Sequence, residues 1–274
     1  MLNANLRLQA LTGKLLKQTL GEHLLAMIAT TDQGLFAVDP EDRVVGRELL
    51  QRGSYGKEEV ARLERFVSPD ADVLVVGAHI GSLVVPLSKK CRELVAFEAN
   101  PATYRLLSIN LRLNEVTNCR AVNLAANDVK GSIEFLMSRA NSGGSKRMPL
   151  IKQAMYFYDK PETISVEAVR LDDYLAHEGF GLVVMDIEGS EYFALHGMQR
   201  ILKGSRALAV EFLPHHLKNV SSKSVQQFLA LIEPHFSTLT IPSKKVTIER
   251  GNFQATLQRM YDADEGDDGI IFEK

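Results

Sequence analysis

The sequence has few cysteines: only Cys91 and Cys119 occur among its 274 residues, and they lie far apart in the chain. Two such residues are too few for a disulfide framework, and their separation does not match the short spacing of cysteine-based zinc sites. Both lie beside apolar stretches. We therefore expect them to act as small buried apolar side chains.

Long apolar runs are also missing. No run approaches the roughly 20 residues that a membrane-spanning helix needs. The leucine-rich N-terminal stretch is interrupted by Arg7, Lys14, Lys17 and Glu22, so it does not have the continuous apolar core of a signal peptide. The sequence therefore predicts a cytoplasmic protein without a membrane partner.

Neither sign of charge dominates, since the formal net charge is -2 and the isoelectric point is near 6.4. Without a global basic field, nucleic acid is not an expected partner. The local basic run at residues 145–147 is interpreted as a solvated loop. An apolar content of 45% and a charged content of 24% are typical of a globular domain, and the chain is long enough to bury a full core.

The N-terminal part is predicted to be helical, because apolar residues recur at near-helical spacing from about residue 6 to 28. Gly13 and Gly21 weaken the case for one continuous helix. We expect this segment to pack on the body of the protein, with a substrate lid or a homodimer contact as the alternatives. A short hairpin formed by Leu35–Val38 and Arg43–Val45, and then a helix over residues 57–66, are expected to follow.

From residue 73 onwards, short apolar runs alternate with helical stretches such as Pro101–Leu113 and Ser190–Leu202. This alternation predicts a parallel sheet covered on both faces. Thr238–Ile241 and Ile270–Phe272 are expected to complete it as antiparallel edge strands. The expected parallel strands are Val73–Val76, Leu94–Phe97, Ala121–Ala125, Leu182–Met185 and Ala207–Phe212.

Residues 137–162 break this pattern with a glycine- and serine-containing stretch followed by three aromatic residues. A long loop inside a compact domain is usually functional or mobile. Its place in the order of elements puts it near the carboxyl end of the third strand. The sequence contains no internal repeat and no interdomain linker, which indicates a single domain.

The first predicted strand leads directly into a glycine turn, Gly77-Ala78-His79-Ile80-Gly81. A glycine at the end of a strand lets the backbone approach a ligand closely, and the free N–H groups of the next helix point at that ligand. Nucleotide-type ligands bind at the carboxyl ends of such strands. The spacing GxxxG, in place of GxGxxG, disfavours a pyrophosphate and is compatible with an adenosine joined to an amino-acid tail.

The second predicted strand ends at Glu98, a carboxylate that can accept hydrogen bonds from both ribose hydroxyls. It follows the glycine turn by close to the roughly 20 residues typical of ribose-binding acids. Asn100 suits a helix N-cap and Pro101 suits the first helical position. We therefore interpret Glu98 as a ribose-binding acid and not as a surface acid at a strand end.

Five stretches together carry a family signature: Val76–Gly81, Phe97–Pro101, Asn110–Asn114, Leu171–Leu175 and Met185–Glu191. In this order they resemble the FkbM family of class I S-adenosylmethionine-dependent methyltransferases. The likeness runs from about Gly53 to the C-terminus.

The resemblance implies an α/β fold with a Rossmann-like, doubly wound, mostly parallel seven-stranded sheet, an antiparallel C-terminal strand and helices on both faces. We expect this domain to cover residues 53–274, with residues 1–52 packed on it as a helical and hairpin extension. S-adenosylmethionine is implied as the methyl donor. Two positions depart from the family pattern: Val75 stands where an acid usually contacts the methionine end of the donor, and His79 stands in place of an asparagine.

Further donor contacts are expected on either side of the glycine turn. Tyr55 is interpreted either as closing over the methionine portion or as packing. Asn127, preferred over Asp128, is expected to hold the adenine amine unless it only stabilises a turn. The predicted donor-binding residues are Tyr55, Gly77, Ala78, His79, Gly81, Glu98, Ala99, Asn100, Asn127 and Asp186.

Methyl transfer is a direct displacement at a sulfonium carbon, so it needs alignment and an activated nucleophile. The predicted catalytic residues are Asp186, Glu188 and His215, with His216 as the alternative histidine base. Glu191 is expected to interact with a helix N-terminus. Although Asp186, Glu188 and Glu211 carry the oxygen ligands that a hard divalent cation prefers, they form no tight signature, and no metal site is predicted.

The sequence therefore predicts an O-methyltransferase that acts on a hydroxyl of a sugar or a secondary-metabolite-type small molecule. An RNA or protein methyltransferase, and a degenerate protein that binds the donor without turnover, are the alternatives. A nicotinamide-linked oxidoreductase ranks last because the GxGxxG spacing is missing.

Overall fold

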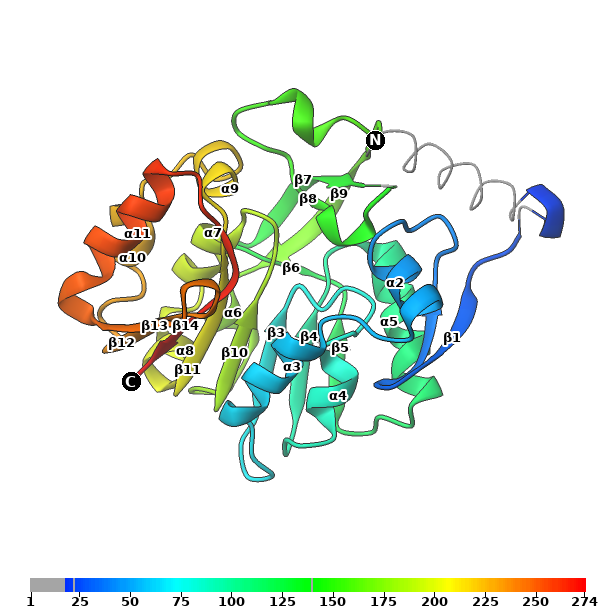
Figure 1. Ribbon diagram of the computed structural model, residues 1–274, viewed down its shortest axis with the longest axis horizontal. Coiled ribbons are helices and arrows are strands. Elements are labelled where there is room, and N and C mark those ends of the chain that lie inside the picture. The colour runs from blue at the N-terminus through cyan, green and yellow to red at the C-terminus, as the bar shows by residue number, and fades with distance from the viewer. Residues whose placement is uncertain (1–17, 22, 139) are drawn as a thin grey trace.

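The computed structural model describes residues 18–21, 23–138 and 140–274 (Figure 1). The predicted N-terminal helix lies largely outside these residues. It does not extend to Ile28, because Met27–Thr31 form strand β1. Within the described part of the chain, no helix is both long and apolar enough to cross a lipid bilayer.

The molecule is built on an eight-stranded sheet with the order β13-β12-β14-β11-β10-β3-β4-β5. Its centre is formed by the parallel strands β3, β4, β10 and β11, in which every residue is buried, as expected for a sheet covered on both faces. The chain runs outward from β3 to β5 and then returns to the other side of β3 with β10. This reversal between β3 and β10 is the position at which open α/β sheets bind ligands. These strands and β5 span Val73–Val76 (β3), Leu94–Phe97 (β4), Cys119–Val122 (β5), Leu182–Met185 (β10) and Ala207–Phe212 (β11).

Helices cover both faces of this sheet, as predicted. Alternate strand residues belong to two separate apolar clusters, because successive side chains of a strand point to opposite faces. One cluster includes Val73 and Val75 and is closed by helices α2 (Val45–Arg52), α3 (Lys57–Leu63), α4 (Val84–Ser88) and α5 (Pro101–Leu113). The other includes Leu74 and Val76 and is closed by α6 (Leu171–Tyr174), α7 (Glu191–His196), α8 (Gln199–Gly204), α9 (Pro214–Asn219), α10 (Val225–Leu229) and α11 (Phe253–Asp262).

The C-terminal side of the sheet differs from the prediction. Strand β14 (Asp267–Glu273) is antiparallel but internal, between β11 and β12 (Thr238–Ile241), so that β12 runs parallel to the central strands. Ile270 and Phe272 are buried on one face of the sheet and Ile271 on the other, as expected for a strand covered on both faces. An additional strand, β13 (Val246–Glu249), pairs with β12 at the edge and raises the strand count above the expected seven.

The helix expected over Ser190–Leu202 is broken into α7 and α8 at Gly197 and Met198. A Cβ on Gly197 would lie 2.0 Å from the carbonyl oxygen of Asn127. The glycine at the break therefore lets the segment around Asn127 pack directly against the backbone between α7 and α8.

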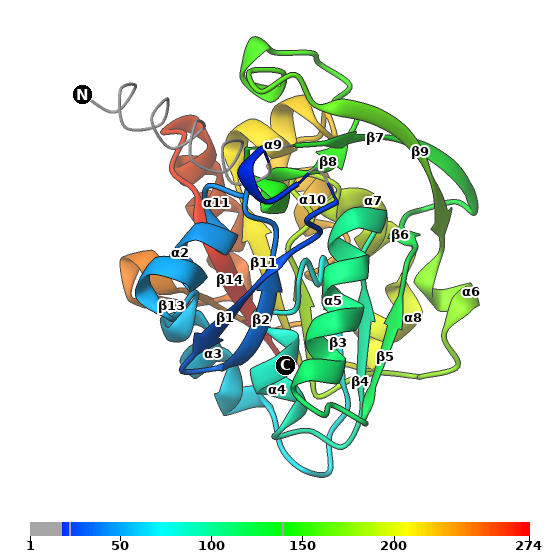
Figure 2. The same cartoon turned by 90° about the vertical axis from the view of Figure 1, so that its right-hand side faces the viewer.

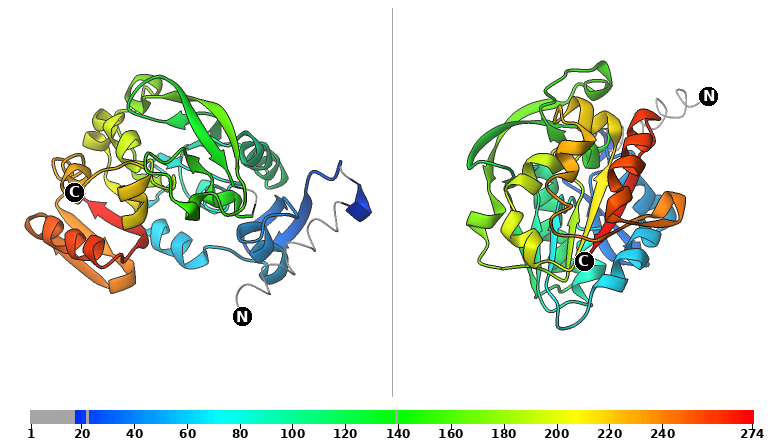
Figure 3. Two further views of the ribbon diagram at one scale, coloured as in Figure 1. Left: turned by 90° about the horizontal axis from the view of Figure 1, so that it is seen from above. Right: turned by 90° about the vertical axis from the view of Figure 1, so that its left-hand side faces the viewer.

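A second, four-stranded sheet with the order β6-β9-β7-β8 lies at one end of the large sheet (Figures 1 and 3). Its two long strands were not predicted, although apolar residues alternate with serine and glutamate along them, as in Ile133-Glu134-Phe135 and Ile164-Ser165-Val166, and pack together in one small cluster. The expected loop over residues 137–162 connects these two strands and contains β8 and two short 3-10 turns. The strands span Ala125–Ala126 (β6), Gly131–Met137 (β7), Lys146–Arg147 (β8) and Glu162–Val169 (β9).

The N-terminal hairpin has a different register from the predicted one. Strand β1 pairs with β2 (Gly34–Val38) across a turn at residues 32–33, and no strand forms at residues 43–45. Val45 instead begins α2, since Asp42 Oδ1 accepts the Val44 N–H at 2.8 Å and Val45 and Leu49 are buried at helical spacing.

Asn110 of α5 and Asn114 at its C-cap bind this hairpin to the body, where β2 and α5 lie side by side (Figure 2). Asn110 is completely buried; its Oδ1 accepts the Ala37 N–H at 2.6 Å, and its Nδ2 donates to the Ala37 and Ile80 carbonyls at 3.2 and 2.8 Å. One turn later, Asn114 makes the equivalent pair of bonds with Leu35 in a more exposed position. The Asn110–Asn114 motif is therefore a clamp on β2.

Replacing the buried asparagine should destabilise the fold. Asn110→Ala leaves the Ala37 N–H and two carbonyls without partners, and we expect a loss of about 3 kcal/mol in the free energy of unfolding. Urea denaturation followed by circular dichroism measures it. Asn114→Ala is the matched control and should cost less than about 1 kcal/mol; equal losses for both variants would contradict the clamp.

Candidate functional site

A cavity opens at the carboxyl ends of β3, β4 and β10, at the reversal of the strand order. The structure brings together in its wall most of the residues that the sequence predicted to bind a donor. These residues are Tyr55, Gly77, Ala78, His79, Glu98, Ala99 and Asp186, together with the predicted catalytic residue Glu188.

The glycine turn forms one side of the cavity. Gly77 has φ +91°, and a Cβ there would lie 1.8 Å from the Asp186 carbonyl oxygen, so only glycine fits between β3 and β10. Gly81, predicted as a donor contact, does not line the cavity. Its φ of +95° and its close approach to Leu107 give it a role in the turn and in helix packing.

Glu98 is buried and held by three hydrogen bonds. Its Oε2 accepts the His79 N–H at 2.7 Å, and its Oε1 accepts from the Asn100 N–H at 2.8 Å and from the Thr103 hydroxyl at 2.9 Å. An ionised carboxylate has about four acceptor positions, so Oε2 keeps capacity for a ligand. The carboxylate is thus fixed in place before any ligand binds.

Asn100, also predicted as a donor contact, lies outside this cavity. Its Oδ1 accepts the Ala102 N–H at 3.0 Å, which confirms the predicted N-cap of α5, and its Nδ2 donates to Ser145 at 3.3 Å. These two bonds commit the Asn100 side chain to the N-terminus of α5 and to Ser145 in the loop between β7 and β9.

Three oxygen-bearing side chains form the end of the cavity nearest α3: Tyr55, Glu59 and Asp186. Burial raises the pKa of Glu59 to about 7, and burial together with the Asp186 charge raises the pKa of Tyr55 well above its usual range. Glu59 was not predicted, because a glutamate beside Glu58 in the first turn of a helix is indistinguishable in sequence from a surface acid.

Asp186 lines the cavity and is accessible to solvent there. Because protein atoms surround the carboxyl group on its other sides, desolvation raises its pKa well above the usual range, and the charges of Glu188 and Glu191 raise it further. No hydrogen bond to its carboxylate is found within residues 18–21, 23–138 and 140–274. This carboxylate is therefore available to a cationic ligand.

The opposite end of the cavity is apolar, with Leu124, Ala125, Ala126, Ile133 and Phe135 in its wall. These residues come from the loop after β5 and from β6 and β7, so this part of the site depends on the second sheet.

Asn127, predicted to hold the adenine amine, does not reach the cavity. It is buried behind β6, where its Oδ1 accepts from Arg147 at 2.9 Å and its Nδ2 donates to the Val129 carbonyl at 3.1 Å. The two bonds engage both ends of the amide, and the side chain stabilises the turn and β8. These contacts correspond to the turn role, which was the alternative to an adenine contact for Asn127.

The loop between β7 and β9 covers the cavity with residues 141–143. His79 Nε2 is hydrogen-bonded to the Ser142 hydroxyl at 2.7 Å, and Ser142 in turn donates to Asp42. His79 has φ +49°, a left-handed conformation in which histidine is enriched, as asparagine is. His79 therefore both makes the turn and ties the glycine loop to its cover.

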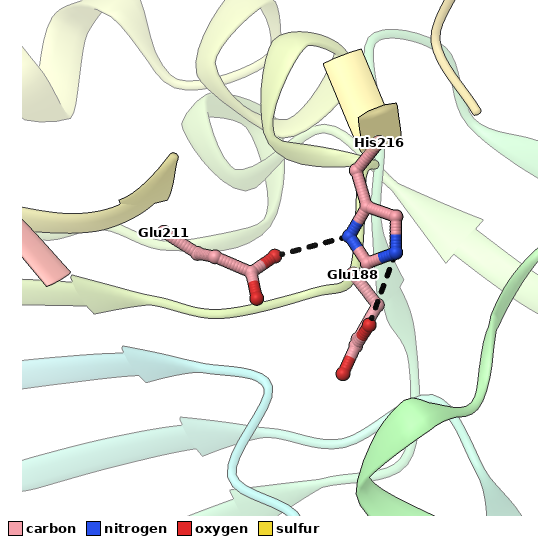
Figure 4. Close-up of side chains that lie close together, drawn as sticks. All are labelled: Glu188, Glu211 and His216. Atoms are coloured by element: carbon pink, nitrogen blue, oxygen red, sulfur yellow. Dashed lines mark hydrogen bonds and ion pairs between the residues drawn. The ribbon is translucent and has the colours of Figure 1, made fainter. Parts of the chain in front are cut away.

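A group of polar side chains lies beside Glu188. Figure 4 shows Glu211 and Glu188 on the two sides of His216, with Nδ1 3.4 Å from Glu211 Oε2 and Nε2 3.5 Å from Glu188 Oε2. The fourth member is Lys146 of β8, whose Nζ lies 2.8 Å from Glu188 Oε2 and 3.2 Å from His216 Nε2. Lys146 is buried, which corrects the solvated-loop interpretation of residues 145–147.

His216 is a neutral hydrogen-bonding group in this cluster. Burial, and then the neighbouring Lys146 and His215, lower its pKa to about 2. Nε2 therefore accepts a hydrogen bond from Lys146. Burial, and next the charge of Asp186, raise the pKa of Glu211 well above its usual range.

His215, the first choice of the sequence as a base, lines neither this cavity nor the neighbouring one that contains His216. Successive residues of a helix point about 100° apart, so only one histidine of the pair can face Glu188 from the first turn of α9. The carbonyl of His215 instead accepts the Tyr156 hydroxyl at 3.0 Å.

Glu191 holds the turn between β10 and α7. Its Oε1 accepts the N–H groups of Ile187 and Gly189 at 3.0 and 3.2 Å. The side chain is thus bonded to the backbone just before its helix, which fixes the positions of Asp186 and Glu188.

The oxygen set weighed and not predicted as a cation site was Asp186, Glu188 and Glu211. The compact group of possible ligands in the described residues is Glu188, Glu211 and His216, without Asp186. Lys146 already places an ammonium against Glu188 and His216. The lysine therefore supplies the positive charge that a metal ion would supply at this position.

We expect Lys146 to keep divalent cations out of this cluster. Titration of the protein with Mn²⁺, followed by electron paramagnetic resonance, should show no site of micromolar affinity in the wild type, and Lys146→Met should create one. Lys244→Met, which removes an exposed ion-paired lysine, is the control and should stay without a site. A wild-type Mn²⁺ site that disappears in His216→Asn would overturn this assignment.

Comparison with solved structures gives similarities at low sequence identity. Trm5b from Pyrococcus abyssi is 14% identical, with a TM-score of 0.42 over 77% of this chain, which spans about half (47%) of that protein. M. jannaschii TYW2 in complex with AdoMet is 14% identical, with a TM-score of 0.46 over 91% of this chain and 87% of that one. The M. jannaschii tRNA m1G37 methyltransferase is 12% identical, with a TM-score of 0.46 over 92% and 58%.

No curated protein matches the sequence significantly. The sequence profile of the methyltransferase FkbM domain matches residues 76–234, which is more than half of the chain. The matched region runs from the last residue of β3 through β4, β10 and β11 and contains Gly77, Glu98, Asp186 and Glu188. The chain therefore belongs to the FkbM methyltransferase family.

Proposed function

We propose that the protein is an S-adenosylmethionine-dependent O-methyltransferase that acts on a hydroxyl of a sugar or secondary-metabolite-type small molecule. The observation that carries the proposal is the convergence of the Gly77 turn, Glu98 and Asp186 on one cavity. The adenine lies against the apolar end at residues 124–126, the ribose binds Glu98, and the methionine portion extends toward Tyr55.

The cationic amino group of the donor is recognised by Glu59 and Asp186. The acid that the family usually carries two residues before the first glycine is replaced here by Val75, which is fully buried in the cluster with Leu49 and Leu63. A carboxylate in that apolar position would be costly to ionise. Glu59 offers a carboxylate to the same cavity from helix α3 and takes over this function.

The acceptor is a small molecule in this proposal because the formal net charge of -2 provides no overall basic field for a polyanion. Filter binding with tRNA at low and high salt tests the alternative. Salt-dependent retention would redirect the proposal to an RNA acceptor. A protein that binds the donor but transfers no methyl group to any acceptor would be a degenerate member of the family.

Donor binding should depend on Glu98. Isothermal titration calorimetry with S-adenosylhomocysteine should give saturable binding to the wild type and an affinity about 10- to 100-fold lower for Glu98→Gln, since a charge-assisted hydrogen bond is worth about 1.5–3 kcal/mol. Glu93→Gln changes an exposed acid just before β4 and should bind like the wild type. The proposal fails if the wild type binds neither the methyl donor nor its product.

The affinity for the donor should rise with pH around neutrality. The pKa of Glu59 is raised to about 7 by burial, and it faces Arg62, Asp268 and Tyr55, so the carboxylate that pairs with the ammonium forms only as the pH rises through 7. Between pH 6 and 8 the dissociation constant of S-adenosylhomocysteine should fall several-fold, and Glu59→Gln should flatten that dependence.

A ligand that lacks the amino-acid portion distinguishes loss of the contact to the ammonium group from a general effect of the substitution on the fold. Methylthioadenosine keeps the adenosine but has no ammonium group, so its binding should be the same in Glu59→Gln and in the wild type. An equal loss of affinity for both ligands would show that Glu59 acts only through the fold.

A further inference from the structure

A second cavity adjoins the first and shares Asn141 and Glu188 with it. The loop between β7 and β9 forms most of its wall. On the polar side lie Lys146, Glu188 and His216, and on the other side lie Leu136, Met155 and Tyr158. Met155 and Tyr158 are 51% and 66% exposed, so the apolar side faces an open rim.

Glu188 is fixed between the two cavities by its backbone. It has φ +56°, an unusual conformation for a glutamate, and Gly189 follows with φ +99°, packed against Val220 so closely that a Cβ would lie 2.6 Å from it. Such strain persists where the surrounding structure enforces it and occurs most often at functional sites. The strained turn directs the Glu188 side chain to Lys146.

Lys146 is held on three sides. Besides Glu188 and His216, it lies 5.4 Å from the centre of the Tyr156 ring, and Tyr156 is itself fixed through its hydroxyl by His215 and Asn219. Strand β8 sets its position through the pairing of Lys146 with Leu136. An ammonium this well anchored and open to a cavity suits a ligand oxygen that carries or develops negative charge.

We propose that the second cavity is the acceptor subsite, in which Lys146 and Glu188 bind the reacting hydroxyl of a ring compound whose apolar face lies on Met155 and Tyr158. This inference rests on the proposed function, since it takes the first cavity to hold the donor. His216 is a positioning residue, because its Nε2 accepts from Lys146 and it does not line the donor cavity.

The residues divide the chemistry between them. Lys146 donates a hydrogen bond to the acceptor oxygen and favours its ionised form, as an adjacent opposite charge does. Glu188 accepts the hydroxyl proton. The oxygen then forms a bond to the methyl carbon while the carbon–sulfur bond breaks, and its electron pair stays on sulfur to give S-adenosylhomocysteine.

Two small probes test the subsite on the full chain saturated with S-adenosylhomocysteine: catechol, an aromatic diol, and methyl α-D-glucopyranoside, a sugar. Saturation-transfer NMR measures binding of each probe. We expect at least one to bind the wild type and the Lys244→Met control, and to bind at least 10-fold more weakly to Lys146→Met. The probe that binds identifies an aromatic or a carbohydrate acceptor.

Two further variants keep the test independent of folding. The double variant Lys146→Met/Glu188→Gln leaves no unpaired charge and should also lose the probe. In Lys146→Met, which changes a residue outside the wall of the first cavity, the affinity for S-adenosylhomocysteine should stay at the wild-type level. With S-adenosylmethionine in place of the product, Glu188→Gln should keep the probe bound but lose methyl transfer to it, measured by mass spectrometry.

The inference is overturned if neither probe binds the product complex, or if Lys146→Met binds the probe as tightly as the wild type. Failure of the wild type to bind S-adenosylhomocysteine at all is a different result, since it removes the proposed function before the acceptor subsite is tested.

Discussion

The site depends on how closely β3 and β10 approach each other at their carboxyl ends. The Gly77 backbone passes the Asp186 carbonyl oxygen with no room for a side chain. This contact lies where the strand order reverses, so the turns after the two strands diverge above it and leave space for a ligand. A larger residue at position 77 would separate the two strands and displace the Asp186 and Glu98 sides of the cavity together, because the His79 N–H binds Glu98.

Charge is arranged unevenly along the site. Carboxylates gather around the first cavity at Glu59, Glu98, Asp186 and Glu188, whereas the buried cation Lys146 belongs to the neighbouring cavity. A donor with a sulfonium and an ammonium group suits the first environment, and an oxygen nucleophile suits the second. Glu188 lines both and interacts directly with the cation.

Much of the fold could be predicted from sequence because β3, β4 and β10 are short, continuous apolar runs, each followed directly by a glycine or an acid. The glycine turn, Glu98 and Asp186 could be predicted as candidate site residues for the same reason, because each stands at the end of such a strand. For Asn127 the sequence left an adenine contact and a turn role open, because a strand-end asparagine serves either, and its bonds to Arg147 and the Val129 carbonyl correspond to the turn role.

Other features depend on contacts between distant segments, which leave little trace in local sequence. Lys146 has the sequence environment of a surface loop, and it is buried only because β8 pairs with β7 and α9 brings His216 to it. Strand β14 was expected at an edge, since the sequence shows that it is apolar but not that β12 covers its far side. The predicted strand at residues 43–45 was wrong because the chain, after the expected turn near Glu41, continues into helix α2 from Val45.

The loop between β7 and β9 has an evolutionary consequence. It supplies Lys146, Met155, Tyr156 and Tyr158 to the second cavity, while the glycine turn, Glu98 and Asp186 of the first cavity come from strand ends of the large sheet. Insertions or exchanges within this one segment can therefore reshape the second cavity and leave most of the first unchanged. Among the described loop residues only Asn141 lines both cavities, so a change at that position would alter the two together.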